Sequence, residues 1–263
     1  MKHLKFTLIL LSGLFVAGIV RSQSIDDGKK FLYYEKFISA KNVFQQLVNA
    51  NPNNDEAIYW LGQTLIAPDE DKDIEGAKAV YQKGLAANPN SALLNAGMGH
   101  VELLEGKTQQ ARNHFETALS LSKSVDVLDA VGFANGDFDS KYGDAAYAVE
   151  KLTQATNTKK FRDARIMTDL GDAYRKAGDG GAAQRAYEAA LTMDPTYARA
   201  KYRLGRIYQS QGSNQQGIFL PYYNEAIALD PNYTKVYWTL HQYFYETDVV
   251  KSATYLDKYL KAK

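Results

Sequence analysis

Residues 164–195, ARIMTDLGDAYRKAGDGGAAQRAYEAALTMDP, carry the clearest structural signal in the chain. Apolar residues recur at spacings of three and four on either side of a short turn, which is the pattern of two amphipathic helices. Gly171 and Ala183 are small at the points where two antiparallel helices would approach most closely. Asp194-Pro195 ends the second helix, because proline lacks a backbone donor and disfavours helical geometry in the residue before it. The stretch therefore predicts a helical hairpin.

The same pattern recurs along the chain, with steps of 34 to 38 residues between successive copies. Its first mark is a small residue followed four positions later by an aromatic one, as in Ala40/Phe44, Ala77/Tyr81, Ala111/Phe115 and Ala183/Tyr187. We assign weaker copies to Ala145/Val149, Phe219/Tyr223 and Ala253/Asp257. Its second mark is a glycine that leads each of the first six pairs by 12 to 15 residues, at Gly28, Gly62, Gly99, Gly132, Gly171 and Gly205. A single hairpin cannot bury its apolar stripe alone, so such units are expected to stack into a solenoid.

This repeat resembles the tetratricopeptide repeat family. In residues 164–195 the family pattern falls on Leu170-Gly171, Tyr174, Gly178, Ala183, Tyr187, Ala190 and Pro195. The resemblance implies an all-α fold, a right-handed α-solenoid of about seven helix-turn-helix repeats. The expected repeats are 24–53, 55–89, 92–123, 125–159, 164–195, 198–231 and 234–263. The fourth is the most degenerate, and the seventh has His241 in place of the glycine.

Composition excludes several classes of function. The 263 residues are 45% hydrophobic and 23% charged, which is ordinary for a globular protein. Lys plus Arg is 31 and Asp plus Glu is 30, and this balance argues against a general nucleic-acid binder, whose affinity comes mainly from phosphate neutralisation. Cysteine is absent, which excludes disulfides, thiolate zinc sites, cysteine nucleophiles and a lipidated N-terminal cysteine.

The first 22 residues resemble a targeting segment. Lys2 and Lys5 precede an uncharged apolar stretch at 6–20, which is short for a membrane span but suits a secretory signal peptide. We predict cleavage before Gln23, export to the periplasm or the exterior, and no membrane span in the mature chain. The alternatives are an uncleaved anchor that ends at Arg21 and a buried N-terminal helix.

Candidate catalytic and metal motifs are incomplete. Residues 106–108 end like a phosphate-binding loop but lack the earlier glycine, and the acidic residues in 69–73 lack the glycine and glutamate of a calcium loop. His100 and His114 could meet across one hairpin, but no acidic partner stands at metal-ligand spacing. The acidic turns at 67–76 and 135–143 are expected to be solvated. We predict a protein that is not an enzyme and that uses no cofactor or metal.

The resemblance also implies a binding face, because the first helices of tetratricopeptide units line a concave groove. Carrying the family's groove positions over to the last three units gives a basic and aromatic set: Arg175, Arg199, Tyr202, Arg206, Lys235, Trp238, Gln242 and Tyr245. Arginine and aromatic side chains dominate binding hot spots, so the expected partner is an acidic protein or peptide segment with an apolar anchor. Alternatively, the aromatic residues are core residues and the arginines are solvated.

The predicted function is a non-catalytic scaffold or adaptor of the cell envelope that binds a protein or peptide in this groove. The alternative is a structural repeat module of a larger envelope protein whose activity lies elsewhere. At the C-terminal end, Val250, Leu256 and Leu260 would leave an uncovered apolar edge. This edge predicts either self-association or a longer natural chain.

Overall fold

A computed structural model describes residues 23–68, 71–137, 140–157 and 160–263. Within these ranges the chain forms fourteen α-helices and one 3-10 helix, η1 (Ser213–Gln215), and no β-strand. The expected signal segment 1–22 and the acidic residues Asp69 and Asp139 lie outside the described residues. Of the described helices, none combines the length and the apolar character that crossing a membrane requires.

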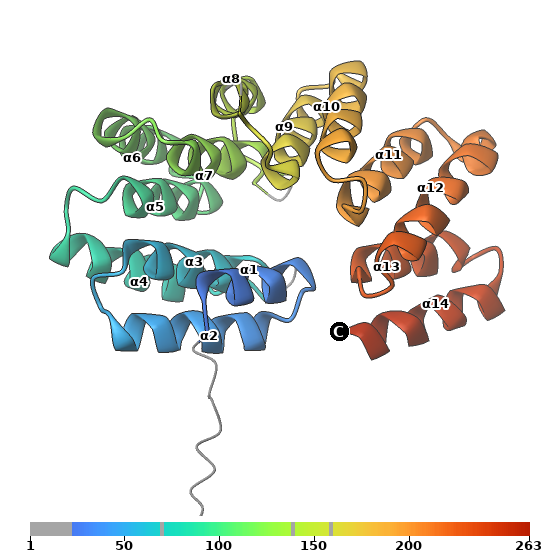
Figure 1. Cartoon of the computed structure of the whole chain (residues 1–263), viewed down its shortest axis with the longest axis horizontal. Coiled ribbons are helices and arrows are strands. Elements are labelled where there is room, and N and C mark those ends of the chain that lie inside the picture. Colours follow the sequence, from blue (N-terminus) through green and yellow to red (C-terminus); the bar gives the residue numbers. More distant parts are fainter. Residues whose placement is uncertain (1–22, 69–70, 138–139, 158–159) are drawn as a thin grey trace, which may run out of the picture.

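The helices form consecutive pairs that stack into an all-α solenoid (Figure 1). In chain order the pairs are α1 (Ile25–Tyr33) with α2 (Phe37–Ala50), α3 (Asp55–Ile66) with α4 (Ile74–Ala87), α5 (Ala92–Leu104) with α6 (Thr108–Leu121), α7 (Val125–Gly136) with α8 (Ala145–Thr156), α9 (Ala164–Lys176) with α10 (Gly180–Met193), α11 (Ala198–Ser210) with α12 (Gln216–Leu229), and α13 (Thr234–Phe244) with α14 (Val249–Ala262). Each of the seven ranges expected from the sequence contains one pair.

Local sequence signals begin and end these helices. Asp163 caps α9 by accepting a hydrogen bond from the Ile166 backbone N–H at 3.1 Å, and Asp179 caps α10 in the same way through Ala182 at 2.8 Å. Between the two helices Gly178 has φ 84°, a left-handed geometry that glycine adopts without steric cost. The turn of the fifth unit is thus fixed by its own residues.

In five of the seven units a glycine of the first helix packs against an aromatic residue of the second helix. A Cβ on Gly171 would lie 2.3 Å from the Tyr187 ring, and one on Gly62 would lie 2.2 Å from the Tyr81 ring. Both tyrosines are fully buried, so the rings fill the space that the glycines leave. The same contact joins Gly28 to Phe44, Gly99 to Phe115 and Gly205 to Tyr223. The periodic glycines and the periodic aromatic residues of the sequence therefore pack against each other within a unit.

The expected register was wrong in the fourth unit. The pair predicted there was Ala145/Val149, but Ala148 and Leu152 are the fully buried residues, and Leu152 faces Gly132. The first residue of the buried pair is the fourth residue of the second helix in the other units, and α8 begins only at Ala145 because a longer turn precedes it. Spacing along the chain alone could not reveal that shift.

The seventh unit also departs from the expected register. Its fourth-position residue in α14 is Ser252, which is buried, and not the predicted Ala253, which is exposed. The Ser252 hydroxyl lies 2.8 Å from His241 Nδ1 and 3.1 Å from the His241 carbonyl oxygen. A hydrogen-bonded contact therefore stands where the other units pack glycine against an aromatic ring.

The turn between α7 and α8 is fixed by a lysine and is not simply solvated, contrary to our expectation. Lys176 Nζ donates to the backbone carbonyls of Asn135, Asp137 and Ser140 at 3.0, 2.6 and 2.9 Å. Ser140 is fully buried. The sequence of the turn could not predict this arrangement, because Lys176 binds backbone carbonyl groups, which every residue has.

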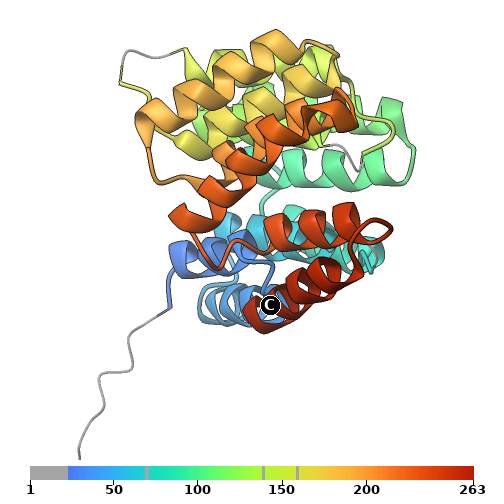
Figure 2. The same ribbon diagram turned by 90° about the vertical axis from the view of Figure 1, so that its right-hand side faces the viewer.

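The array curves until its two ends meet. Figures 1 and 2 show the first helix pair and the last one facing each other. The turn between α1 and α2 provides Tyr33, whose ring stacks on Tyr233 at 5.2 Å, and Glu35, which accepts a hydrogen bond from Thr234 at 2.7 Å. Glu35 and Thr234 are 199 residues apart in sequence. We call the contact between this turn and the last two units the seam.

The last helix leaves apolar side chains in solvent. Val250 and Leu260 are 78% and 64% exposed, while Leu256 is half-buried. This placement agrees with the expected edge, and whether the edge associates with another molecule stays a prediction.

Candidate functional site

Buried ion pairs link the first helices of the fifth and sixth units. Arg199 Nη2 lies 2.6 Å from Asp169 and 2.7 Å from Asp172. Asp172 also accepts a hydrogen bond from the Tyr187 hydroxyl at 2.6 Å and lies 2.8 Å from Arg203. Burial opposes ionisation of Asp172, but Arg203 and Arg199 outweigh it and lower the pKa of this carboxyl below its usual value.

Arg199 therefore has structural partners within the array. Its side chain is 16% exposed, and its charge is balanced by two aspartates of α9. The network continues through Asp169 to Arg165 at 2.9 Å, and from Arg165 to Asp129 at 2.6 Å. Arg199 is not a free guanidinium facing a groove, because aspartates one repeat earlier neutralise it.

Tyr202 lies in the core. It is 3% exposed, its hydroxyl lies 2.9 Å from Thr239 Oγ1, and its ring meets the edge of Tyr233. It is therefore not available as the exposed anchor that we expected. Arg206 donates to the same hydroxyl at 3.0 Å.

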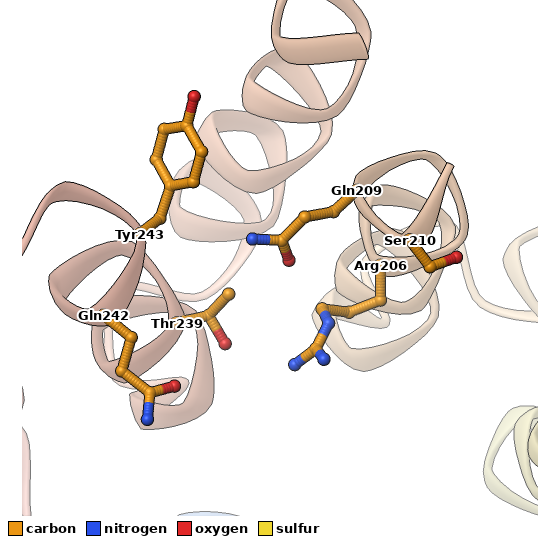
Figure 3. A pocket seen from close by; sticks show the side chains of 6 residues that line it. All are labelled: Arg206, Gln209, Ser210, Thr239, Gln242 and Tyr243. Atoms are coloured by element: carbon orange, nitrogen blue, oxygen red, sulfur yellow. The ribbon is translucent and has the colours of Figure 1, made fainter. Parts of the chain in front are cut away.

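A polar hollow of about 330 Å³ opens between α11 and α13. It is lined by Arg206, Gln209, Ser210, Thr239, Gln242 and Tyr243. Figure 3 shows Arg206 and Gln209 reaching from α11 toward Thr239 on α13. Gln209 Oε1 accepts a hydrogen bond from the Tyr223 hydroxyl at 2.6 Å, which leaves the Gln209 amide nitrogen directed into the hollow. Donors and acceptors from two neighbouring units thus converge on one space.

Three predicted residues lie on α13 or at its end, outside the hollow. Lys235 is half-buried, with its Nζ 3.4 Å from Glu35 at the seam. Trp238 is 39% exposed and packs at 5.2 Å against the Tyr259 ring of α14, and Tyr245 is 66% exposed. These side chains share one face of α13, as expected, but Lys235 already has a partner in the seam.

Arg175 lies half-buried in α9. Burial, and after it the like charge of Arg203, lower the pKa of Arg175. Of the eight predicted residues only Arg206 and Gln242 line the hollow together. Binding by any of them stays a prediction.

Sequence reasoning left Ser210, Thr239 and Tyr243 out of the site. Thr239 and Tyr243 each follow a predicted groove residue by one position, Trp238 and Gln242, and Ser210 is the last residue of α11; Figure 3 shows all three at the hollow. Which side chains reach the hollow depends on packing between units. The one available signal was the clustering of amide and hydroxyl side chains at the ends of the two helices.

The two histidines that we considered together have separate partners. His100 Nδ1 lies 3.1 Å from Gln63 Oε1, and His114 Nδ1 lies 2.7 Å from Glu102 Oε2. Burial, with smaller contributions from Lys72 and Lys176, lowers the pKa of His100 to about 3. In the part of the chain that the structure describes, no group of three His, Cys, Asp or Glu residues is arranged to hold a metal ion.

Comparisons with known proteins agree with this architecture. A family model described as Tetratricopeptide repeat matches residues 168–234. Tetratricopeptide repeat protein 6 of Homo sapiens is 25% identical over 197 residues, which are 74% of this chain and 36% of that protein, so the chain spans about a third of this relative. A thermophilic TPR protein of Thermus thermophilus superposes with a TM-score of 0.54 at 18% identity, covering 70% of this chain and 96% of that one. The human IFIT1 dimer with PPP-AAAA gives a TM-score of 0.60 at 16% identity, covering 90% of this chain and 57% of that one.

Proposed function

Since this chain is a tetratricopeptide-repeat protein, we propose that it is a non-catalytic scaffold that binds an extended protein segment in the hollow between α11 and α13. Tetratricopeptide repeats commonly mediate protein–protein interactions, and their fold is generally a non-catalytic scaffold. The hollow carries the proposal, because it is a concave polar space between two units.

The lining suits a peptide backbone. An extended segment presents one N–H donor and one C=O acceptor per residue, and the amides of Gln209 and Gln242 offer both kinds of partner. Among the described residues Arg206 has no carboxylate within ion-pair distance, so its guanidinium can donate hydrogen bonds to an acidic side chain of the partner. Trp238 and Tyr245, on α13 and at its end, are outside the hollow and offer exposed aromatic surface to a longer segment. The partner we propose is therefore an acidic segment with an apolar or aromatic side chain.

We place this scaffold in the cell envelope, as a periplasmic or secreted protein. The support is the basic and then apolar composition of residues 1–22. Sequencing the N-terminus of the exported protein tests the location, because mature protein should begin at Gln23. The exposed side chains on α14 support a second contact, self-association through that helix.

A second candidate is a structural module of a larger envelope protein. The observation that favours it is length, since the human relative is much longer than this chain. A transcript or an intact mass that extends past Lys263 would support this candidate.

Site-specific photo-cross-linking in the source cell tests the scaffold proposal. A photoreactive phenylalanine at Gln242, beside the hollow, should form a discrete adduct. The matched position is Glu188, which is exposed on α10 and should form none. Adding Arg206→Ala should abolish the Gln242 adduct if the hollow holds the partner. Equal labelling at both positions, or an adduct unaffected by Arg206→Ala, would place the partner elsewhere.

A further inference from the structure

At the seam, one part of the chain lies against another in the way that a peptide lies in its binding site. The inserted part is the turn between α1 and α2, which we call the seam turn: Tyr33, Tyr34 and Glu35. The receiving surface lies at the N-terminal ends of α11 and α13, and we call it the seam site: Tyr197, Tyr233, Thr234 and Lys235. The hollow lies toward the opposite ends of the same two helices, so the two sites are separate.

Aromatic contacts anchor the seam turn. The Tyr33 ring contacts two rings of the seam site, 5.2 Å from Tyr233 in a stacked arrangement and 5.8 Å from Tyr197. Tyr233 is 2% exposed and belongs to the core of the last units. A rigid aromatic side chain seated against buried rings is the usual form of a binding hot spot.

A buried carboxylate gives the contact its polar specificity. Glu35 Oε2 accepts a hydrogen bond from the Thr234 hydroxyl at 2.7 Å, and Lys235 Nζ lies 3.4 Å from Oε1. Thr234 is fully buried and Glu35 is almost so. With the seam turn in place, the Thr234 hydroxyl is shielded from water and donates to the Glu35 carboxylate, so a segment without an acceptor at this position would leave a buried donor unpaired.

The chain's own turn is an imperfect occupant. Glu35 has φ 56°, a left-handed geometry that is strained for a residue with a Cβ. The turn reaches the seam site only because the intervening units bend the array into a nearly closed ring (Figure 1). A separate segment need not carry this backbone strain.

We propose that the seam site is a receptor for a tight turn with adjacent aromatic residues and a carboxylate, and that a partner protein carrying such a turn displaces the seam turn. The seam turn is then an internal competitor that sets how tightly the partner binds. An intramolecular competitor occupies the site for a fixed fraction of the time, so it lowers the apparent affinity of every external ligand by the same factor. Release of the seam turn also opens the ring. This inference concerns a site separate from the hollow and does not rest on the proposed function.

Peptide binding in trans tests the proposal. The probe is a fluorescein-labelled peptide of residues 30–38, KFLYYEKFI, titrated with the purified protein and followed by fluorescence anisotropy. Wild-type protein should bind it weakly. A variant with Tyr33→Ala and Glu35→Gly, which removes the internal competitor, should bind at least tenfold more tightly. Glu35→Gln alone keeps the ring contacts and the backbone geometry but removes the carboxylate charge, and it should give a smaller gain, so the test does not depend on the double variant folding.

Two further substitutions locate the bound peptide. In the open variant, Thr234→Val keeps the side-chain shape but removes the hydroxyl, and it should weaken binding at least tenfold. A peptide with Gln at the position of Glu35 should be weakened similarly, whereas Gln242→Ala in the hollow should change nothing. Equal affinities of wild type and both open variants would overturn the proposal, as would loss of binding through Gln242→Ala. Dimerisation of the open variant in place of peptide binding would assign the seam site to a second copy and overturn it as well.

Discussion

Replacing Asp172 with asparagine should destabilise the array strongly, because this carboxylate holds three buried groups. Arg199, Arg203 and the Tyr187 hydroxyl all lie within 2.8 Å of its oxygens. Asparagine keeps the shape and can still accept from Tyr187. It cannot balance Arg203, whose only ion-pair partner among the described residues is Asp172. Arg199 keeps Asp169 at 2.6 Å.

The expected loss follows from these contacts. Removing one partner of a buried ion pair costs about 3–5 kcal/mol, and the retained contacts of Arg199 and Tyr187 favour the lower end. We therefore expect the free energy of unfolding to fall by about 3 kcal/mol at pH 7. The assay is urea unfolding followed by circular dichroism at 222 nm, with Asp257→Asn as the matched control. Asp257 forms an exposed pair with Lys261 on α14, so its loss should change stability by less than about 1 kcal/mol.

The pH dependence supplies a second readout. The folded protein holds the pKa of Asp172 below its unfolded value of about 3.9, so the stabilisation is complete above that pH and is lost as the pH falls through the folded pKa. Wild type and Asp172→Asn should therefore converge in stability in acid. A loss below about 1 kcal/mol at neutral pH, or a difference that stays constant below about pH 3.9, would refute the reasoning.

Further predictions concern packing, titration, binding and association. Gly171→Ala places a methyl group against the fully buried Tyr187 ring and should cost about 2 kcal/mol in urea unfolding, whereas an unchanged midpoint would contradict the contact. His100 is neutral when folded, so below about pH 6.5 wild type should lose about 1.4 kcal/mol per pH unit from this group, and His100→Gln should lack that slope. Trp238→Ala should reduce partner affinity about thirtyfold, read from the Gln242 adduct, with an unchanged circular dichroism spectrum. Leu260→Glu should abolish any concentration-dependent dimer in analytical ultracentrifugation, and a dimer that persists would move the interface away from α14.

The solenoid could be predicted from sequence because its determinants are local and repeated. Glycine, a small residue and an aromatic ring recur at fixed positions in most of the hairpins, and the glycine and the ring meet within the unit, as Gly171 and Tyr187 do. The predicted buried pair was wrong in the fourth and seventh units, although it was right in the second unit, which also has a long turn. In the fourth unit the extra turn residues moved the buried pair to Ala148 and Leu152, and spacing along the chain cannot show where a helix begins after a longer turn.

The binding face was harder to predict because exposure depends on neighbouring units. The groove positions correctly placed Trp238 and Gln242 on the exposed face of α13, since that is a property of one helix. They could not show that Arg199 would be neutralised by aspartates one repeat earlier, or that Tyr202 would be covered by the seventh unit. They also could not show the seam, which joins residues 199 apart.

The seam changes how the ends of the array should behave. In a linear repeat protein each unit contacts only its neighbours, so the terminal units have one interface instead of two and fray first. Here the first unit contacts the last, and each end therefore gains a second interface through Tyr33 and Glu35. Unfolding of the first hairpin must then loosen the final one, although the rest of the array separates them along the chain. In amide hydrogen exchange the two ends should open as one cooperative unit, and their protection should not fall below that of the hairpins in the middle of the chain.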